Sequence, residues 1–302
     1  MRILVIKLGA LGDFVQALGP AAAIRAHHGD AEITLLTTAP YAELARRAPY
    51  FDHVWIDDRP GVFDPLGLLR LRRRLRDGRF DRVYDLQTST RSGFYHLLMG
   101  RPQWSGIARG ASHPHPGPAR DHMHTLDRQA EQLLLAGIAS VPLPDLSWAA
   151  RDVDYFGLSG RLLLLVPGGA PHRPEKRWPI DHFAALAVLA ARRRMTPVVI
   201  GGAAETSLGA VIAERCSSAR DLTGRTNFGE IVGLARMAQH AVGNDTGPMH
   251  LIAAAGCAST VLYSAASDPA LTAPRGAAVT ILRRATLDSL AVEEVAATLA
   301  VG

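Results

Sequence analysis

The chain has 302 residues, of which 48% are hydrophobic, 20% charged and 6% aromatic, so it is long enough for two globular domains and its composition excludes full-length disorder. Its two cysteines, Cys216 and Cys257, exclude a disulfide scaffold; they lack metal-ligand spacing and are expected to be small buried residues. The formal net charge of +5 favours an anionic partner, but the sign alone does not choose between a nucleic acid, a phosphorylated substrate and a membrane surface.

We expect neither a signal peptide nor a membrane span. Residues 1–23 have the apolar content of a secretory signal, but Lys7 and Asp13 interrupt the apolar core that a signal needs. The longest uncharged stretch, 246–267, is broken by Gly247 and other turn-forming residues. Together with the low cysteine content, this pattern predicts a cytoplasmic protein.

Arginine replaces lysine almost everywhere in this chain. Of 33 basic residues only Lys7 and Lys176 are lysines, which leaves 31 arginines. A chain with this preference is expected to keep lysine where a compact ammonium is needed in place of a planar guanidinium. Both lysines are therefore candidates for functional positions.

The first half alternates strands and helices. A β-branched run, a glycine turn and a helical pattern that extends to about residue 26 open the chain. Further strands are expected over 32–37, 54–56 and 82–85, and a helix over 39–47. This alternation predicts a parallel sheet covered on both faces.

The middle of the chain is expected to be irregular on either side of one helix. Three prolines in 112–120 predict a loop, because each removes a hydrogen-bond donor and fixes φ. A helix is expected over 125–136, and the proline- and glycine-containing segment 141–160 is interpreted as an interdomain linker.

The second half repeats the pattern of the first. Strands are expected over 162–166, 197–200 and 260–263 and in the segment that ends at 242, with helices over 179–194, 205–215 and 228–238 and after 248. The prediction is thus an α/β protein of two Rossmann-like, doubly wound parallel-sheet domains, 1–155 and 156–302.

The turn after the first strand is the first candidate site. Gly9 and Gly12 lie where backbone N–H groups at a helix start can receive an anion, but the spacing is not that of a dinucleotide fingerprint. Asp13 fits two interpretations. With Gln16 three residues later it forms a capping-box pattern, or it acts as a general base on an acceptor hydroxyl.

The segment 243–250 gives the most specific signal. It follows a strand and opens a helix that has a proline in its first turn. Asp245 is a candidate for sugar hydroxyls, and Thr246 and Gly247 for a diphosphate at the positive end of the helix. The alternative is a polar capping turn, and His250 alone fits a packing role.

A third segment combines a glycine turn with cations. The turn 167–169 follows a strand, and the segment 175–179 supplies Lys176, an arginine and an indole. Lys176 is a candidate to neutralise a leaving diphosphate without a metal. The alternative is an exposed helix start with a proline in its first turn.

The fourth candidate is Glu205, which follows a glycine pair at 201–202. Its carboxylate is suited to accept hydrogen bonds from both hydroxyls of a ribose. An acidic residue in the first turn of a helix is an equally good interpretation.

Two possible metal motifs are discounted. Asp152 and Asp154 match the DxD pattern of some sugar transferases, but they lie in the expected linker. Four histidines cluster in sequence, with proline between the first two and i, i+2 spacing in the second pair: His113, His115, His122 and His124. We therefore predict no metal site.

A run of arginines between 70 and 76 is the densest charge cluster in the chain. It is interpreted as a solvated helix face, or alternatively as a docking site for a phosphorylated or membrane-held acceptor. It lacks interleaved aromatic residues, and no nucleic-acid module is recognisable, so no nucleic-acid partner is expected.

Taken in order, these segments resemble the bacterial heptosyltransferases, the inverting sugar transferases that build the inner core of lipopolysaccharide. The resemblance covers nearly the whole chain. It rests on the segments 7–13, 85–87 with 91–92, 176–179, 201–205, 222–224 and 243–250.

The resemblance implies a GT-B architecture in which two domains face a cleft, with the acceptor in the first and an ADP-activated heptose in the second. It implies Asp13 and Lys176 as catalytic residues. The implied donor-binding residues are Gly168, Gly169, Lys176, Trp178, Glu205, Asp245, Thr246, Gly247, Pro248, Met249 and His250. The implied acceptor-binding residues are Gly12, Asp13, Gln87, Arg91 and Ser92.

The resemblance further implies that no cofactor or metal is needed, since the ADP-sugar is a substrate. The acceptor would be a phosphorylated lipopolysaccharide core, and the enzyme would be cytoplasmic and could associate peripherally with the inner membrane. The chain departs from the family at 263–269, where Ser264 stands in place of a glycine. This change keeps open a catalytically silent sugar-nucleotide-binding protein, or an epimerase or hydrolase on the same scaffold.

Overall fold

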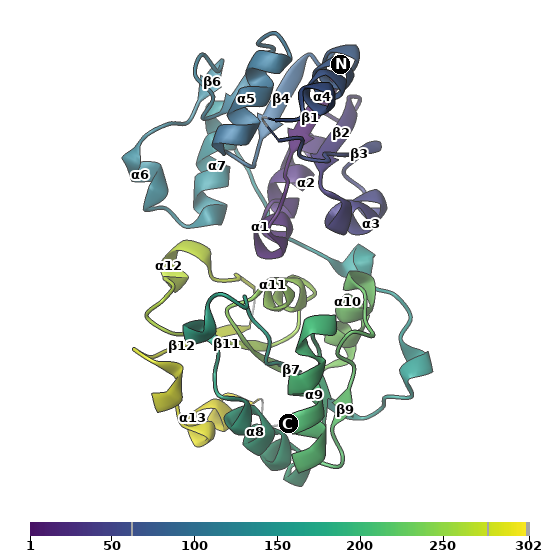
Figure 1. Ribbon diagram of the computed structural model, residues 1–302, viewed down its shortest axis with the longest axis vertical. Coiled ribbons are helices and arrows are strands. Elements are labelled where there is room, and N and C mark those ends of the chain that lie inside the picture. Colours follow the sequence, from purple (N-terminus) through teal and green to yellow (C-terminus); the bar gives the residue numbers. More distant parts are fainter. Residues whose placement is uncertain (62, 277, 300–302) are drawn as a thin grey trace. The chain divides into compact units, whose positions relative to one another are not determined.

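The computed structural model describes residues 1–61, 63–276 and 278–299. The chain forms two compact units, unit 1 (Met1–Pro144) and unit 2 (Asp145–Gly302) (Figure 1). The division between them lies inside the segment 141–160 that we expected to be a linker.

Unit 1 contains a six-stranded parallel sheet in the order β3-β2-β1-β4-β5-β6. Its strands are β1 (Arg2–Ile6), β2 (Glu32–Thr37), β3 (His53–Ile56), β4 (Arg82–Asp85), β5 (Gln103–Gly106) and β6 (His113–Pro114). Its helices are α1 (Leu11–Gln16), α2 (Leu18–His27), α3 (Ala39–Arg47), α4 (Pro65–Asp77), α5 (Thr90–Leu98), α6 (Pro118–Asp121) and α7 (Thr125–Leu135).

Unit 2 repeats this topology in the order β12-β11-β10-β7-β8-β9. Its strands are β7 (Arg161–Val166), β8 (Met195–Val199), β9 (Arg220–Asp221), β10 (His240–Asn244), β11 (Ser259–Tyr263) and β12 (Val279–Arg283). Its α-helices are α8 (Ile180–Arg192), α9 (Thr206–Arg215), α10 (Phe228–Met237), α11 (Gly247–Ala254), α12 (Pro269–Thr272) and α13 (Val292–Ala297). Short 3₁₀ helices cover Ser147–Ala149, Asp154–Phe156, Pro174–Lys176, Ala203–Glu205 and Leu287–Ser289.

Burial of the central strands explains the continuous apolar runs in the sequence. Residues 162–165 of β7 are fully buried, although successive side chains point to opposite faces of a sheet. Leu163 and Leu165 pack with α8 and α13 on one face, and Leu162 and Leu164 are buried on the other. Both faces of this sheet are therefore covered, as predicted for a doubly wound α/β unit.

Two local expectations are wrong. The single helix expected up to residue 26 is divided at Ala17, because Pro20 has no N–H to bond the carbonyl of Gln16, four residues earlier. The loop expected over 112–120 contains the edge strand β6 and the first residues of α6. A proline is tolerated at a sheet edge, and Pro118 occupies the first turn of α6, where its missing N–H costs nothing.

The cysteine prediction is confirmed, since Cys216 and Cys257 are free and buried. No helix in the described part of the chain combines the length and the apolar content that a membrane span requires.

Candidate functional site

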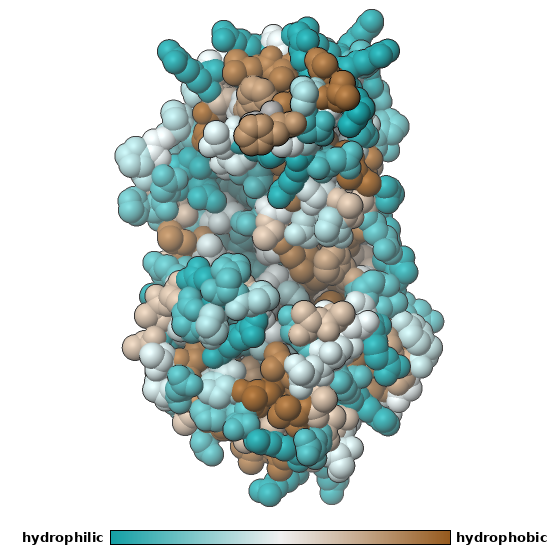
Figure 2. Space-filling model, in the orientation of Figure 1, coloured by the Kyte–Doolittle hydropathy of each residue, from teal (hydrophilic) through white to brown (hydrophobic). Residues whose placement is uncertain are grey.

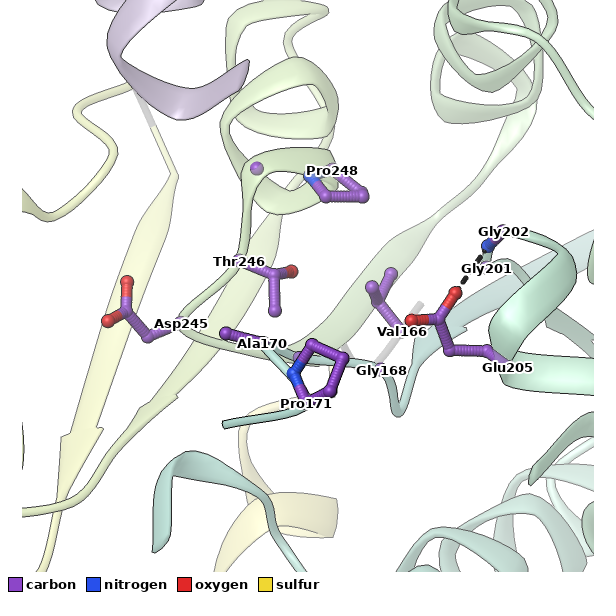
Figure 3. A pocket seen from close by; sticks show the side chains of 12 residues that line it. Val166, Gly168, Ala170, Pro171, Gly201, Gly202, Glu205, Asp245, Thr246 and Pro248 are labelled. Carbon is purple, nitrogen blue, oxygen red and sulfur yellow. Dashed lines mark hydrogen bonds between the residues drawn. The ribbon is translucent and has the colours of Figure 1, made fainter. Parts of the chain in front are cut away.

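Unit 2 has a cavity of about 400 Å³ where the carboxyl ends of β7, β8 and β10 meet (Figure 3). Strands β7 and β10 are neighbours, and the strand that follows each of them in sequence lies on the side away from the other: β8 beside β7, and β11 beside β10. Ligands of open α/β sheets bind at such a switch point. The cavity is lined by Val166, Gly168, Gly169, Ala170, Pro171, Gly201, Gly202, Glu205, Asp245, Thr246, Gly247 and Pro248.

A buried asparagine holds the loops of this cavity together. Asn244, the last residue of β10, is fully buried. Its Nδ2 donates to the carbonyl oxygens of Pro167 (2.9 Å) and Gly168 (3.1 Å), and its Oδ1 accepts from the N–H of Trp178 at 2.9 Å. Asn244 thus fixes the glycine turn and the segment that carries Lys176. Sequence reasoning quoted this residue within the motif but assigned it no role, because its partners lie far away in sequence.

Lys176 and Asp245 form an ion pair at the edge of the cavity. Lys176 Nζ lies 2.8 Å from Asp245 Oδ2, and the two side chains are only 18% and 11% exposed. Burial is the largest single influence on the pKa of Asp245 and would raise it, but the hydrogen bond and charge of Lys176, together with the hydroxyls of Ser267 and Tyr263, outweigh burial and hold the pKa below its usual value. Asp245 is therefore held as a carboxylate beside the cavity.

Thr246 and Gly247 form the start of helix α11 at the cavity wall. Thr246 is the N-cap residue, but its side chain makes no capping bond, and its buried Oγ1 has no hydrogen-bond partner among the described residues. The N–H groups of a first helical turn carry partial positive charge and point outward along the axis. An anion in the cavity would satisfy both kinds of donor.

Glu205 borders the cavity on the side of β8. Its Oε2 accepts from the N–H of Gly202 at 2.6 Å, as the dashed line in Figure 3 shows. Glu205 thus lies in the first turn of a short 3₁₀ helix, as the alternative interpretation expected, and this oxygen bonds the N–H at the helix start. A Cβ added at Gly168 would lie 2.9 Å from Glu205 Cγ, and one added at Gly201 would lie 2.9 Å from Glu205 Cβ. Glycine at both positions permits this close approach.

Three residues that the resemblance assigned to the donor are buried side chains. Trp178 packs in the core against Phe183 and its Nε1 donates to the carbonyl of Leu290 at 3.0 Å. Met249 is fully buried and packs closely against Gly243, and His250 is also buried. None of the three is among the residues that line the cavity.

The turn at Ser264 is closed by its own side chain. Ser264 is buried, and its Oγ accepts from the N–H of Ala266 at 3.2 Å. Arg173 Nη2 donates to the carbonyl of Ala266 at 2.6 Å, which ties this turn to the segment that carries Lys176. Serine therefore provides an ordered turn at this position without a glycine.

Unit 1 has a second cavity, of about 750 Å³, beside the start of α1. Asp13 lines it from the first turn of α1, but the N-cap residue of this helix is Ala10. The prediction that Asp13 caps the helix is therefore wrong, because the helix begins three residues earlier than the capping pattern required. Gly9 has a φ of +125°, and a Cβ there would lie 2.7 Å from the ring of Tyr41, so the turn requires glycine.

Lys7 and Asp85 are two buried charged residues, and the charge of Lys7 interacts with those of both Asp85 and Asp13. The Lys7 ammonium donates to the carbonyl of Leu86 at 3.2 Å, and burial lowers its pKa although Asp13 and Asp85 act in the opposite direction. Burial also raises the pKa of Asp85 to about 6, although its carboxylate accepts backbone hydrogen bonds from Gln87 and Thr88. The Lys7 hydrogen bond to Leu86 thus joins the residues that follow β1 and β4.

The remaining predicted acceptor residues have different surroundings. Gln87 lines the cavity of unit 1, and its Oε1 accepts from the N–H of Leu8 at 2.8 Å. Arg91 donates to the carbonyl of Pro60 at 3.3 Å. Ser92 is fully buried and forms a capping box with Ser89 at the start of α5. Gly12 is half-buried and is not among the lining residues.

No cluster of three or more His, Cys, Asp or Glu able to hold a metal ion occurs in residues 1–61, 63–276 and 278–299. The discounted DxD segment forms a local turn, in which Asp152 Oδ1 accepts from the N–H of Asp154 at 2.8 Å.

Two Rossmann-like units of this topology define the GT-B glycosyltransferase fold. The solved structure of ADP-heptose lipopolysaccharide heptosyltransferase II from Escherichia coli matches with a TM-score of 0.83 at 24% identity, over 99% of this chain and 97% of that one. The heptosyltransferase WaaC of Escherichia coli, solved with ADP-2-deoxy-2-fluoro heptose, matches with a TM-score of 0.77 at 19% identity, over 98% of both chains.

The model of glycosyltransferase family 9 (heptosyltransferase) matches residues 68–296, so the chain belongs to this family. It is therefore a glycosyltransferase of α/β architecture. Among curated relatives, lipopolysaccharide heptosyltransferase 2 of Escherichia coli (strain K12) is 26% identical over 314 residues, which cover 94% of this chain and 88% of the relative.

Proposed function

We propose that the enzyme transfers a heptose from ADP-heptose to an inner-core lipopolysaccharide acceptor, with inversion at the anomeric carbon. The observation that carries this proposal is the cavity of unit 2, where Thr246 Oγ1, at the start of α11, has no hydrogen-bond partner among the described residues and lies next to the Lys176–Asp245 pair. Family membership and the relatives named above support heptose as the sugar.

In the proposed donor complex, the diphosphate lies at the start of α11. Thr246 and Gly247 donate to the phosphate oxygens, and the Lys176 ammonium neutralises the charge that develops on the leaving diphosphate. Glu205 accepts a ribose hydroxyl through its second oxygen, since the first already accepts from Gly202. Asp245 accepts hydrogen bonds from the heptose hydroxyls.

Asp13 is the proposed general base. As the acceptor oxygen attacks the anomeric carbon, its proton passes to the Asp13 carboxylate, the bond from that carbon to the diphosphate oxygen breaks, and ADP leaves. Attack from the face opposite the diphosphate inverts the configuration. Gln87 and Arg91 are proposed to contact the acceptor, whereas Gly12 and the buried Ser92 shape the loops around it.

No cofactor or metal enters this scheme, because Lys176 and the helix start supply the positive charge that a metal supplies in other transferases. The acceptor is amphipathic if it carries a lipid anchor. We therefore also propose that the enzyme works in the cytoplasm, peripherally associated with the inner membrane.

Calorimetric titration with ADP, UDP, GDP and ADP-heptose, each with and without EDTA, tests the donor site. We expect selective binding of ADP and ADP-heptose that EDTA leaves unchanged. A preference for UDP or GDP would overturn the donor assignment, and binding lost in EDTA would overturn metal independence.

A transfer assay with a delipidated inner-core acceptor then tests the reaction. We expect ADP release that depends on the acceptor. Equal ADP release from donor alone would indicate a hydrolase, conversion of the donor to an isomer would indicate an epimerase, and binding without turnover would indicate a silent binding protein.

A further inference from the structure

Unit 1 exposes an unusual number of large apolar side chains on one surface. They are Phe63 (97% exposed), Leu66 (67%), Leu69 (56%), Phe94 (45%) and Leu97 (49%). Figure 2 shows apolar groups in brown among hydrophilic groups in teal, over the region where Figure 1 places α4 and α5. We call these five residues and the arginines of α4 the α4–α5 surface. Such a concentration of exposed apolar groups marks a site of association.

Several contacts bring the parts of this surface together. Helices α4 and α5 pack against each other, and Arg76 Nε donates to the carbonyl of Leu98 at 2.9 Å. Arg91 of α5 donates to the carbonyl of Pro60, which holds Pro60 against α5. The apolar residues of these elements therefore belong to one surface.

Helix α4 divides its residues by face. Gly67, Leu71 and Leu75 are buried at i, i+4 spacing, which places Leu66 and Leu69 on the outward face. The helix thus buries one apolar stripe and exposes a second, shorter one at its N-terminal end. Packing within unit 1 explains the first stripe but not the second.

Arginines follow the exposed leucines along α4. Those of α4 are Arg70, Arg72, Arg73, Arg74 and Arg76, and all of them are exposed. The only acidic residue of the helix, Asp77, pairs with Arg73 at 3.5 Å. A groove of about 360 Å³ along the helix is lined by Arg2, Trp55, Arg70, Arg73, Arg74, Asp77 and Gly78. There Arg74 lies 4.7 Å above the ring of Trp55.

We propose that the α4–α5 surface docks on an anionic lipid bilayer. The apolar side chains enter the boundary between headgroups and acyl chains, and the arginines contact lipid phosphates. A nucleic acid would use the arginines but leave five apolar side chains without a role. A second copy of the same surface would bring like charges together in a symmetric contact. This inference rests on the membrane association proposed above and assigns it to particular residues.

Co-sedimentation with lipid vesicles tests the proposal on the intact protein. The vesicles are phosphatidylcholine alone and an equal mixture of phosphatidylcholine and phosphatidylglycerol. We expect binding to the anionic vesicles that weakens as salt is raised. Replacing Arg72 and Arg73 with Gln should weaken it about 30-fold, and Leu66→Ser with Leu69→Ser about tenfold or more.

Matched controls are available in the same unit. Leu134→Ser with Leu135→Ser removes two leucines that are similarly exposed on α7, and Arg46→Gln with Arg47→Gln removes two charges from α3. Both control pairs should bind vesicles as the unaltered protein does. All variants should keep their melting temperature and their affinity for ADP.

Three outcomes would overturn the proposal: no binding of the unaltered protein to anionic vesicles, equal loss in the control pairs, or a leucine variant that dissociates an oligomer in light scattering. Transfer to the delipidated acceptor needs no bilayer. Failure of vesicle binding with intact transfer would therefore refute the docking surface alone, and loss of transfer with intact vesicle binding would refute the proposed reaction alone.

Discussion

At the scale of single residues, the Lys176–Asp245 pair sets the charge of the donor cavity. Each group is mostly withdrawn from water, and the other lies 2.8 Å away. An ammonium held in this environment interacts with a diphosphate more strongly than one in bulk water, because the local dielectric constant is lower. The effect of removing it is therefore measurable in binding.

Lys176→Met should weaken ADP binding by at least about tenfold, since a charge-assisted hydrogen bond is worth about 1.5–3 kcal/mol. The pKa of Asp245 should rise in this variant, because its principal cationic partner is lost. Calorimetric titration measures the affinity. An unchanged dissociation constant would remove Lys176 from the donor site.

Asp13→Asn should reduce kcat by about 10²–10⁴-fold, the usual contribution of a positioned general base, and leave ADP affinity unchanged. Asp127 is a suitable control, because it is also an acidic residue in the first turn of a helix in unit 1. Asp127→Asn should keep normal turnover. Turnover of Asp13→Asn close to that of the control would sink the assignment of the base.

At the scale of elements, two buried side chains bond the loops that follow the strands. Asn244 does so in unit 2, and Asp85 does so in unit 1. Asn244→Ala removes three hydrogen bonds and leaves the carbonyls of Pro167 and Gly168 and the N–H of Trp178 without this partner. We expect the free energy of unfolding to fall by about 2–4 kcal/mol in urea denaturation. Asn227→Ala, which removes the half-buried N-cap of α10, should cost only about 1 kcal/mol. Equal losses would contradict the role of Asn244.

Asp85 gives unit 1 a distinctive pH dependence. Its pKa is raised from 3.8 to about 6, so the folded state binds more protons than the unfolded state between these values. Stability from this group is therefore present at low pH and is lost as the pH rises through about 6, by up to about 3 kcal/mol. Asp85→Asn should remove this slope in urea denaturation followed from pH 4 to pH 7. An unchanged slope would show that another group titrates.

The sequence predicted most elements but not all side-chain roles. The strands at 32–37 and 82–85 and the helix at 39–47 were located correctly, because apolar runs and turn residues mark them locally. Ser92 and Trp178 were assigned to ligands, yet both are buried. A motif shows that residues act together but not which of them face the cavity, since that depends on packing against distant segments. Asn244 shows the same limit in a residue to which the motif assigned no role, because its hydrogen-bond partners lie far away in sequence.

At the scale of the whole molecule, the donor contacts that we propose all belong to unit 2. Hydrogen exchange with and without ADP tests this division. We expect slower exchange in 166–171, 201–205 and 244–248, because bound phosphate and ribose engage N–H groups there. The segment 8–13 of unit 1 should be unaffected by ADP alone. Protection confined to unit 1 would show that the nucleotide binds there and would contradict the proposed donor site in unit 2.

The two glycines that lie against Glu205 have a consequence for redesign of the enzyme. Where Gly168 and Gly201 face the cavity, its wall is main chain, and no side chain is available there to exchange. A library aimed at accepting a different nucleotide should therefore vary Ala170 and Pro171, which line the same cavity with side chains. Random mutagenesis should show the converse pattern, with inactive clones enriched at 168 and 201 and tolerated changes at 170 and 171.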